Sequence, residues 1–272
     1  CIRDRLYERL AQIAPEEAED TSLAELPIDA KLDNLLYTFL QSADESIIDL
    51  YATELAGFDN ATTVMPKDAP NIEKFRKEYH TANLLQMRGD LDGLLAMTPA
   101  ELPDNPSYYQ LLNYFWSGNG FLTAQEVGGL TEEAARTARR LLNAKNEWAD
   151  TGVPLAIFYT YATIRAHAVL GDEEEVRQVR QSLLDLGNDE LLDQYLAPFI
   201  ALSVVDLDEA VKRLLEHKAE HPTLHVTDWV AALHIYARNV VVHPDMQAFY
   251  VEEGKWVDYL AERVPEYAEY GR

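Results

Sequence analysis

Two stretches of this sequence share one pattern: Leu170-Gly171-Asp172-Glu173-Glu174-Glu175-Val176 and, 34 residues later, Val204-Val205-Asp206-Leu207-Asp208-Glu209-Ala210. Each joins an apolar segment to an amphipathic segment that begins with carboxylates. A glycine or small polar residue lets a helix end in a left-handed cap, and carboxylates stabilise the N-terminus of the helix that follows. The pattern therefore predicts pairs of helices joined by tight turns.

Similar turns occur earlier in the chain. They are Arg88-Gly89-Asp90-Leu91-Asp92 and Gly128-Gly129-Leu130-Thr131-Glu132-Glu133-Ala134. Gly89 and Gly129 are 40 residues apart, and Gly129 and Gly171 are 42 apart. Helical periodicity dominates between these turns, and Val240-Val241-Val242 is too short to predict a sheet. We expect an all-α protein, a superhelical array of antiparallel helical hairpins with irregular ends.

The individual helices follow from the same periodicity. Thr131 with two glutamates after it is typical of a helix N-terminus. The predicted helices span residues 5–13, 29–42, 44–55, 71–87, 107–116, 154–170, 172–186, 190–204, 207–221, 228–241 and 256–263.

Residues 157–224 resemble the tetratricopeptide repeat family. The 34-residue spacing is that family's repeat length. In that family a loop Gly is followed five positions later by a small residue and, after twelve more, by a Pro. Those places are taken here by Val205, Ala210 and Pro222. One repeat earlier they are taken by Gly171, Val176 and Asn188. Val205 and Asn188 depart from the pattern, as do Ile164 and Pro198 where the first helix has a small residue. The resemblance implies stacked helical hairpins and does not identify a ligand.

A second resemblance lies near the C-terminus. His243-Pro244-Asp245-Met246-Gln247-Ala248-Phe249 and Lys255-Trp256-Val257-Asp258-Tyr259-Leu260 are similar to the ends of repeat regions in bacterial regulators that carry a winged-helix, cyclase or kinase domain. The resemblance implies a capping helix over the last apolar face of the array, which such arrays require. The expected organisation is an N-terminal helical segment of atypical repeats (1–70), tetratricopeptide-like repeats (71–224) and C-terminal capping helices (225–272).

The composition limits the partners. The chain has 47 acidic and 23 basic residues among 272, a formal charge of −24. Such a surface repels a phosphate backbone and an anionic lipid leaflet, so we expect no nucleic acid to bind this segment. No stretch approaches the roughly 20 apolar residues of a membrane-spanning helix.

The single cysteine is Cys1. One interpretation is a truncated reading frame or a sequence artefact, because Ile-Arg-Asp-Arg follows directly and no Met precedes. The other is a lipidated bacterial cysteine, although a flexible polar tether would be expected after it. We take truncation as the working assumption and expect a cytoplasmic location, with an envelope lipoprotein anchored at Cys1 as the alternative.

No catalytic, metal or cofactor site is predicted. His217, His221 and His225 have helical i, i+4 spacing, but Pro222 should end the helix and turn His225 away. Acid pairs such as Glu132-Glu133 lie at expected helix starts, which already explains them. Ser117-Gly118-Asn119-Gly120 lacks the Lys-Ser/Thr of a phosphate-binding loop and is interpreted as a turn between helices.

Aromatic residues supply the candidate binding site. In the tetratricopeptide register, the inner face of successive first helices presents Phe158, Tyr161, Arg165, Tyr195, Phe199, Trp229 and Tyr236. Rigid aromatic rings with an Arg suit capture of a peptide, protein segment or small signal. The competing interpretation is that these rings pack between repeats as core.

We therefore expect a non-catalytic binding or scaffolding module, possessing a helical-repeat groove and belonging to a larger bacterial regulator. The alternatives are a helical hydrolase whose acids line a cleft, and the envelope scaffold described above.

Overall fold

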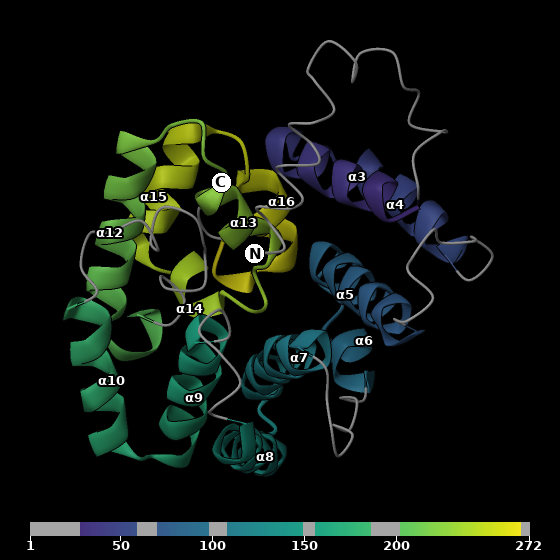
Figure 1. Cartoon of the computed structure of the whole chain (residues 1–272). Coiled ribbons are helices and arrows are strands. Elements are labelled where there is room, and N and C mark those ends of the chain that lie inside the picture. Colours follow the sequence, from purple (N-terminus) through teal and green to yellow (C-terminus); the bar gives the residue numbers. More distant parts are fainter. Residues whose placement is uncertain (1–27, 59–69, 98–107, 149–155, 186–201, 268–272) are drawn as a thin grey trace.

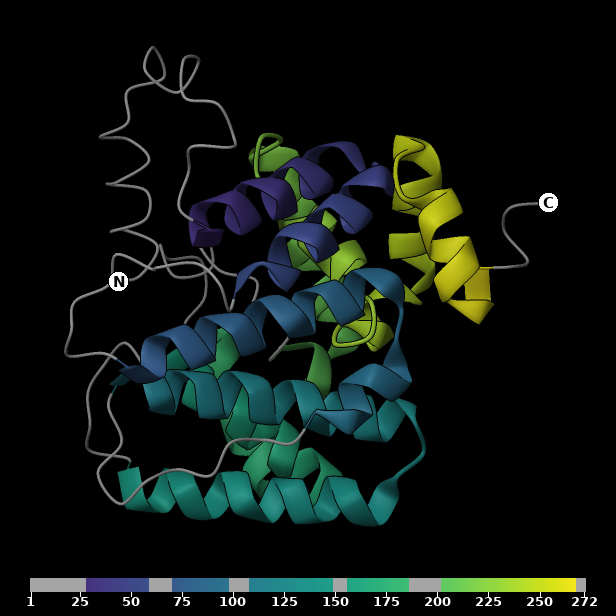
Figure 2. The same cartoon turned by 90° about the vertical axis from the view of Figure 1, so that its right-hand side faces the viewer.

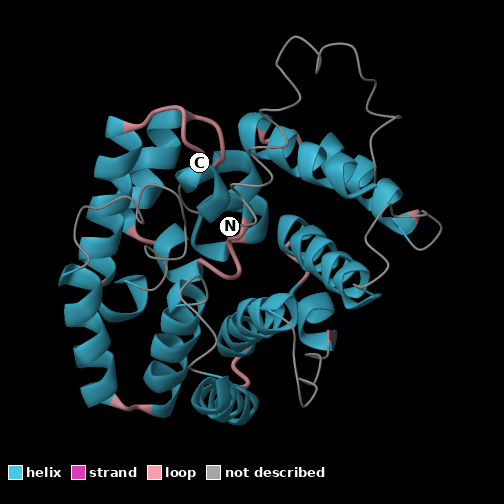
Figure 3. Cartoon of the chain, in the orientation of Figure 1, coloured by secondary structure: helices cyan, strands magenta, loops and turns pink. Residues whose placement is uncertain are grey.

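The computed structural model describes residues 28–58, 70–97, 108–148, 156–185 and 202–267 (Figure 1). All regular structure in these ranges is helical, and they contain no strand (Figure 3). The expectation of an all-α protein is confirmed. The elements are α3 (Ile28–Ser42), α4 (Ser46–Ala56), α5 (Pro70–Arg88), α6 (Leu91–Ala96), α7 (Tyr108–Val127), α8 (Thr131–Trp148), α9 (Ala156–Leu170), α10 (Glu173–Asp185), α12 (Leu207–Glu220), α13 (Val226–Ala232), α14 (Arg238–Val241), α15 (Pro244–Glu253), α16 (Val257–Arg263) and the 3-10 turn η4 (Pro265–Tyr267).

Three glycine turns are built in the same way. Gly89, Gly129 and Gly171 have φ of 69°, 72° and 77°, which an L side chain rarely adopts. In each turn the residue after the glycine donates its N–H to the carbonyl five residues back, at 2.8–2.9 Å. The glycine N–H reaches the carbonyl three residues back, at 2.9–3.1 Å. These paired bonds are the Schellman cap, and they confirm the left-handed ends predicted from the sequence.

The fourth turn differs because Val205 stands where the others have glycine. No left-handed residue occurs there: Asp206, with φ −156°, caps α12 by accepting the Glu209 N–H at 3.2 Å. The Asp206 carboxylate also pairs with Arg180 of α10. The hydrogen bond from Arg180 is the main cause of the lowered pKa of Asp206.

Helices α5 to α10 pack in an alternating order. α5 contacts α6 and α7, α7 contacts α8 and α9, and α9 contacts α8 and α10. Figure 2 shows α5, α7 and α8 as successive layers. Each glycine turn thus joins helices that pack against one another, α5 with α6, α7 with α8 and α9 with α10.

The prediction of a turn at Ser117-Gly118-Asn119-Gly120 is wrong. The predicted helix 107–116 continues through these residues, and α7 ends only at Val127. The glycines serve close packing instead. A Cβ on Gly118 would lie 2.6 Å from Leu141 Cδ2 in α8, and one on Gly120 would lie 2.4 Å from the ring of Tyr236. Tertiary contacts therefore outweigh the low helix propensity of glycine here.

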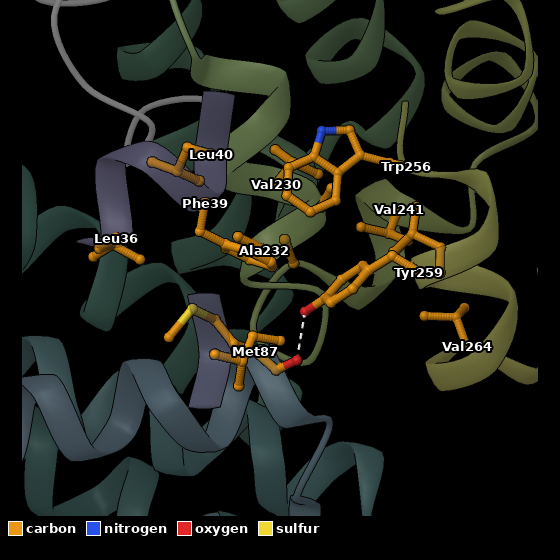
Figure 4. Close-up of a cluster of buried hydrophobic side chains, with 14 of the residues drawn as sticks. Leu36, Phe39, Leu40, Met87, Val230, Ala232, Val241, Trp256, Tyr259 and Val264 are labelled. Carbon is orange, nitrogen blue, oxygen red and sulfur yellow. Dashed lines mark hydrogen bonds between the residues drawn. The ribbon is translucent and has the colours of Figure 1, made fainter. Parts of the chain in front are cut away.

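The C-terminal helices do not lie over α12 alone. The main core unites residues of α3, α4 and the end of α5 with residues of α12 and the segment from Val230 to Tyr267. Figure 4 shows Phe39 and Leu40 of α3 facing Trp256 and Tyr259, with Met87 of α5 below them. Segments at opposite ends of the described chain share one apolar core, and α13 contacts α3 directly.

Aromatic rings fill this shared core. Phe39 meets the rings of Trp256 and Tyr259 edge-on, at centroid distances of 5.3 and 5.5 Å. Trp256, Tyr250 and Tyr267 are at most 1% exposed. Edge-to-face pairs add about 0.5–1.5 kcal/mol to the stabilisation from apolar burial. The C-terminal segment is thus an integral part of the fold, where the sequence predicted only a cap.

Candidate functional site

The predicted binding residues fall into three groups in the structure. Phe158 and Tyr161 belong to the first turns of α9, whose side chains lie outside the described part. Tyr195 and Phe199 also lie outside the described residues. The groove prediction can be compared with the structure only at Arg165, Trp229 and Tyr236.

Arg165 connects two helices of the alternating array. Its guanidinium pairs with the carboxylate of Glu126, near the end of α7, with Nη2 2.7 Å and Nε 2.9 Å from Oε2. The Arg165 side chain is 12% exposed and that of Glu126 is 39% exposed. The pair thus stands at the surface between α7 and α9, where a ligand carboxylate would have to compete with Glu126 for the guanidinium.

Trp229 and Tyr236 are brought together in one apolar cluster, in which Tyr236 is buried and Trp229 is half-buried. Tyr236 is 8% exposed and belongs to an apolar cluster with Leu94, Ala124, Leu233 and Ile235, against which Trp229 packs. Tyr236 therefore fits the competing interpretation, in which the aromatic rings pack as core.

A buried carboxylate organises the residues around Trp229. Asp228 is 6% exposed. Its Oδ1 accepts hydrogen bonds from Lys255 Nζ at 2.6 Å and from Trp256 Nε1 at 2.8 Å, and its Oδ2 lies 2.8 Å from His225 Nδ1. Lys255 also donates to the carbonyl of Leu40 in α3. The Asp228 carboxylate therefore joins α13 to α3 and to the start of α16.

The charge on Asp228 is maintained by its partners. Burial raises the pKa of the carboxyl group, but the hydrogen bonds from Lys255, Trp256 and His225 outweigh burial, and the net shift is downward. A carboxylate that accepts a histidine Nδ1–H fixes the ring's tautomer, as in the catalytic triad. Asp228 also neutralises Lys255, however, so its geometry is that of a buried structural ion pair.

A second polar junction ties the C-terminal segment to α5. The carbonyl oxygen of Met87 accepts a hydrogen bond from the Tyr259 hydroxyl at 2.8 Å (Figure 4). It also accepts one from Arg263 Nε at 3.1 Å. Arg263 stacks on Tyr259, with its guanidinium carbon 4.1 Å from the ring centroid, and pairs with Glu45 at 2.7 Å. Helix-end carbonyls lack partners within their helix, and these side chains supply them.

His234 lies beside this junction. It is 1% exposed, and its ring contacts that of Tyr259 edge-on, with 5.7 Å between the centroids. Neither ring nitrogen has a hydrogen bond of standard geometry, and Gln86 Nε2 nearby in the core also has no partner. Burial, with the charges of Arg263 and Arg238, lowers the pKa of His234 to about 3. The buried ring is therefore neutral at physiological pH.

His225 is separated from His217 and His221, as expected from a helix end at Pro222. The rings of His217 and His221 are neighbours at 4.8 Å, whereas His225 lies beyond the helix end and contacts Asp228. No group of three histidine, cysteine or carboxylate side chains suited to a metal ion occurs in the described ranges. Asp90 caps α6 by accepting the Gly93 N–H at 2.8 Å.

Sequence reasoning missed the buried Asp228 carboxylate and the buried Gln86 amide. Both residues stand in apolar segments, for example Val226-Thr227-Asp228-Trp229-Val230. A charged residue inside an apolar run is the signal that identifies a buried polar site, because such a residue is rarely buried without partners.

No family model matches the chain, and searches of curated proteins and of solved structures likewise find no match. Among the described helices, none has the length and apolar character to cross a bilayer.

Proposed function

We propose that this chain is a non-catalytic binding or scaffolding module, a tetratricopeptide-like superhelical array that recognises a peptide, protein segment or small signal. The alternating packing of α5, α7 and α9, each with its partner helix α6, α8 or α10, carries this proposal. Arrays of stacked hairpins offer extended surfaces for non-covalent binding. The proposed setting is the sensory part of a larger bacterial regulator in the cytoplasm.

The proposed binding surface lies on the first helices of the hairpins around α9. Phe158, Tyr161 and Arg165 recur there at spacings of three and four residues, which places them on one side of a helix. Arg165 adds a cation that Glu126 holds in place at 2.7 Å. The chain's formal charge of −24 favours a partner with basic residues around its aromatic or apolar anchors.

The test uses the full chain and a displayed library of random peptides. Tyr161→Ala and Tyr195→Ala should each weaken binding of the selected peptides at least tenfold, since aromatic anchors dominate such interfaces. Arg165→Ala should weaken binding as well. Arg136→Ala is its matched control and should not, because Arg136 is 60% exposed on α8 and pairs with Glu133 of its own helix. Circular dichroism should show unchanged helicity.

Two results would contradict the proposal. Loss of helicity in Tyr161→Ala would identify that ring as core. Turnover of chromogenic glycosides or esters by the purified chain, abolished by His225→Ala or by an acid-to-amide variant, would favour the hydrolase alternative instead.

A further inference from the structure

The segment from Val226 to Val241 departs from the helix that its sequence predicts. Periodicity predicts one helix over residues 228–241, but α13 ends at Ala232 and α14 begins only at Arg238. Leu233 has φ −98° and ψ 33°, and Ala237 has φ −108° and ψ 27°. The prediction of a continuous helix is therefore wrong at residues 233–237.

The interruption is partial. Leu233 donates to Trp229, Ala237 to Leu233 and Val241 to Ala237, all at 2.9 Å, which is the helical i to i−4 pattern. Ile235 differs: its N–H donates to the side-chain oxygen of Gln86 in α5 at 3.2 Å. A tertiary hydrogen bond thus stands in place of a helical one.

A second tertiary contact holds the same five residues. The ring of Tyr236 lies against the backbone of α7 at Gly120, where an added Cβ would be 2.4 Å from the ring carbon Cζ and 2.6 Å from the hydroxyl oxygen. Only glycine permits this approach. The interrupted form is therefore maintained from outside, by Gln86 of α5 and Gly120 of α7.

Unmet polar groups weigh against the interrupted form. Both ring nitrogens of His234 and Nε2 of Gln86 are buried without a hydrogen bond of standard geometry. Gln86 Nε2 loses its hydration on burial without a partner in exchange, and the His234 ring retains only an interaction with the backbone at Ala231, which disfavours this arrangement. The helical periodicity of the sequence favours a continuous helix at the same position. Local periodicity and the tertiary contacts of Gln86 and Gly120 therefore favour different arrangements of residues 233–237.

We propose that residues 233–237 form a two-state switch between this interrupted helix and a continuous one. The interrupted state requires Gln86 and Gly120 at their present distances. A change in the packing of α5 on α7 releases Ile235, whose N–H then bonds to the carbonyl of Ala231, four residues back as in any α-helix. The proposal rests on the proposed function only in its purpose, which is to transmit binding on the array to the C-terminal segment.

The test measures backbone 13Cα chemical shifts of residues 233–237 in the full chain. Gly120→Ala inserts a methyl group against Tyr236, and Gln86→Met removes the acceptor of the Ile235 N–H. Both variants should move these shifts toward helical values and slow amide exchange at Ile235 at least tenfold. Gly118→Ala is the matched control, because its methyl group faces Leu141 of α8 and leaves residues 233–237 untouched.

Unchanged shifts in a folded Gln86→Met variant would overturn the proposal, and so would shifts toward coil values. If Gly120→Ala fails to fold, Gln86→Met decides alone. Since the readout needs no partner, failure here is distinguishable from failure of peptide binding.

Discussion

The hydroxyl of Tyr259 donates a 2.8 Å hydrogen bond to the backbone carbonyl of Met87, a residue 172 positions earlier in the chain. This contact joins the end of α5 to α16. Because α16 also shares its core with α3, the C-terminal segment stabilises the first and middle helices together.

Tyr259→Phe should lower the free energy of unfolding by about 1 kcal/mol, since it removes one buried hydrogen bond and leaves the ring in place. Urea unfolding followed by circular dichroism would measure the change. Val251→Ala, at a residue 48% exposed in α15, serves as the control and should alter stability by less than about 0.5 kcal/mol. Equal stability of Tyr259→Phe and the unaltered chain would argue against the Met87 junction.

Asp228→Asn should destabilise the protein by about 3 kcal/mol, because it leaves the ammonium of Lys255 without its counter-charge in a mostly buried place. Asp245→Asn is the comparison, since Asp245 is 73% exposed at the start of α15. Thermal unfolding of both variants would show a large loss only for the first. A restored stability in the double variant Asp228→Asn with Lys255→Met would identify the unpaired charge as the cause.

His234 should make stability depend on pH. Its pKa is about 3 in the folded protein, against an ordinary value of 6.5 for the exposed ring of the unfolded chain, so between these values the unfolded chain binds the extra proton. Stability attributable to His234 therefore falls as the pH decreases below about 6.5, by about 1.4 kcal/mol for each pH unit. Urea titrations at pH 7, 6, 5 and 4 would compare the chain with His234→Met, whose curve lacks this contribution. Above about pH 7.5 the difference between the two should be constant, and a constant difference down to pH 4 would contradict the prediction.

Gly89→Ala and Gly129→Ala should differ, although both glycines form the same left-handed cap. A methyl group on Gly129 meets nothing within 4 Å, so that variant should lose only about 1 kcal/mol from backbone strain. On Gly89 the methyl group would lie 3.2 Å from Arg263 Cγ and 3.4 Å from His234 Nε2, and we expect a loss of roughly 2–3 kcal/mol. Differential scanning calorimetry of the two variants checks the order. Equal losses would show that α16 does not press on this turn.

The sequence by itself determined the all-helical character of the described residues and the three glycine turns. Apolar residues at helical spacing, glycines followed by acids, and Thr131 before two glutamates are local signals, and short-range hydrogen bonds at Gly89, Gly129 and Gly171 realise them directly. The same local reasoning predicted that Pro222 ends α12 before His225.

Only the tertiary structure decided three other features: α7 continues through Gly118 and Gly120, the helix after Asp228 is interrupted at Leu233, and the Asp228 carboxylate is buried. Each depends on a partner far along the chain. Gln86 is 149 residues from Ile235, and Leu40 is 215 residues from Lys255. Contacts at such separations leave no periodic trace in the sequence, because packing of distant side chains, and not local propensity, supplies the stabilising free energy.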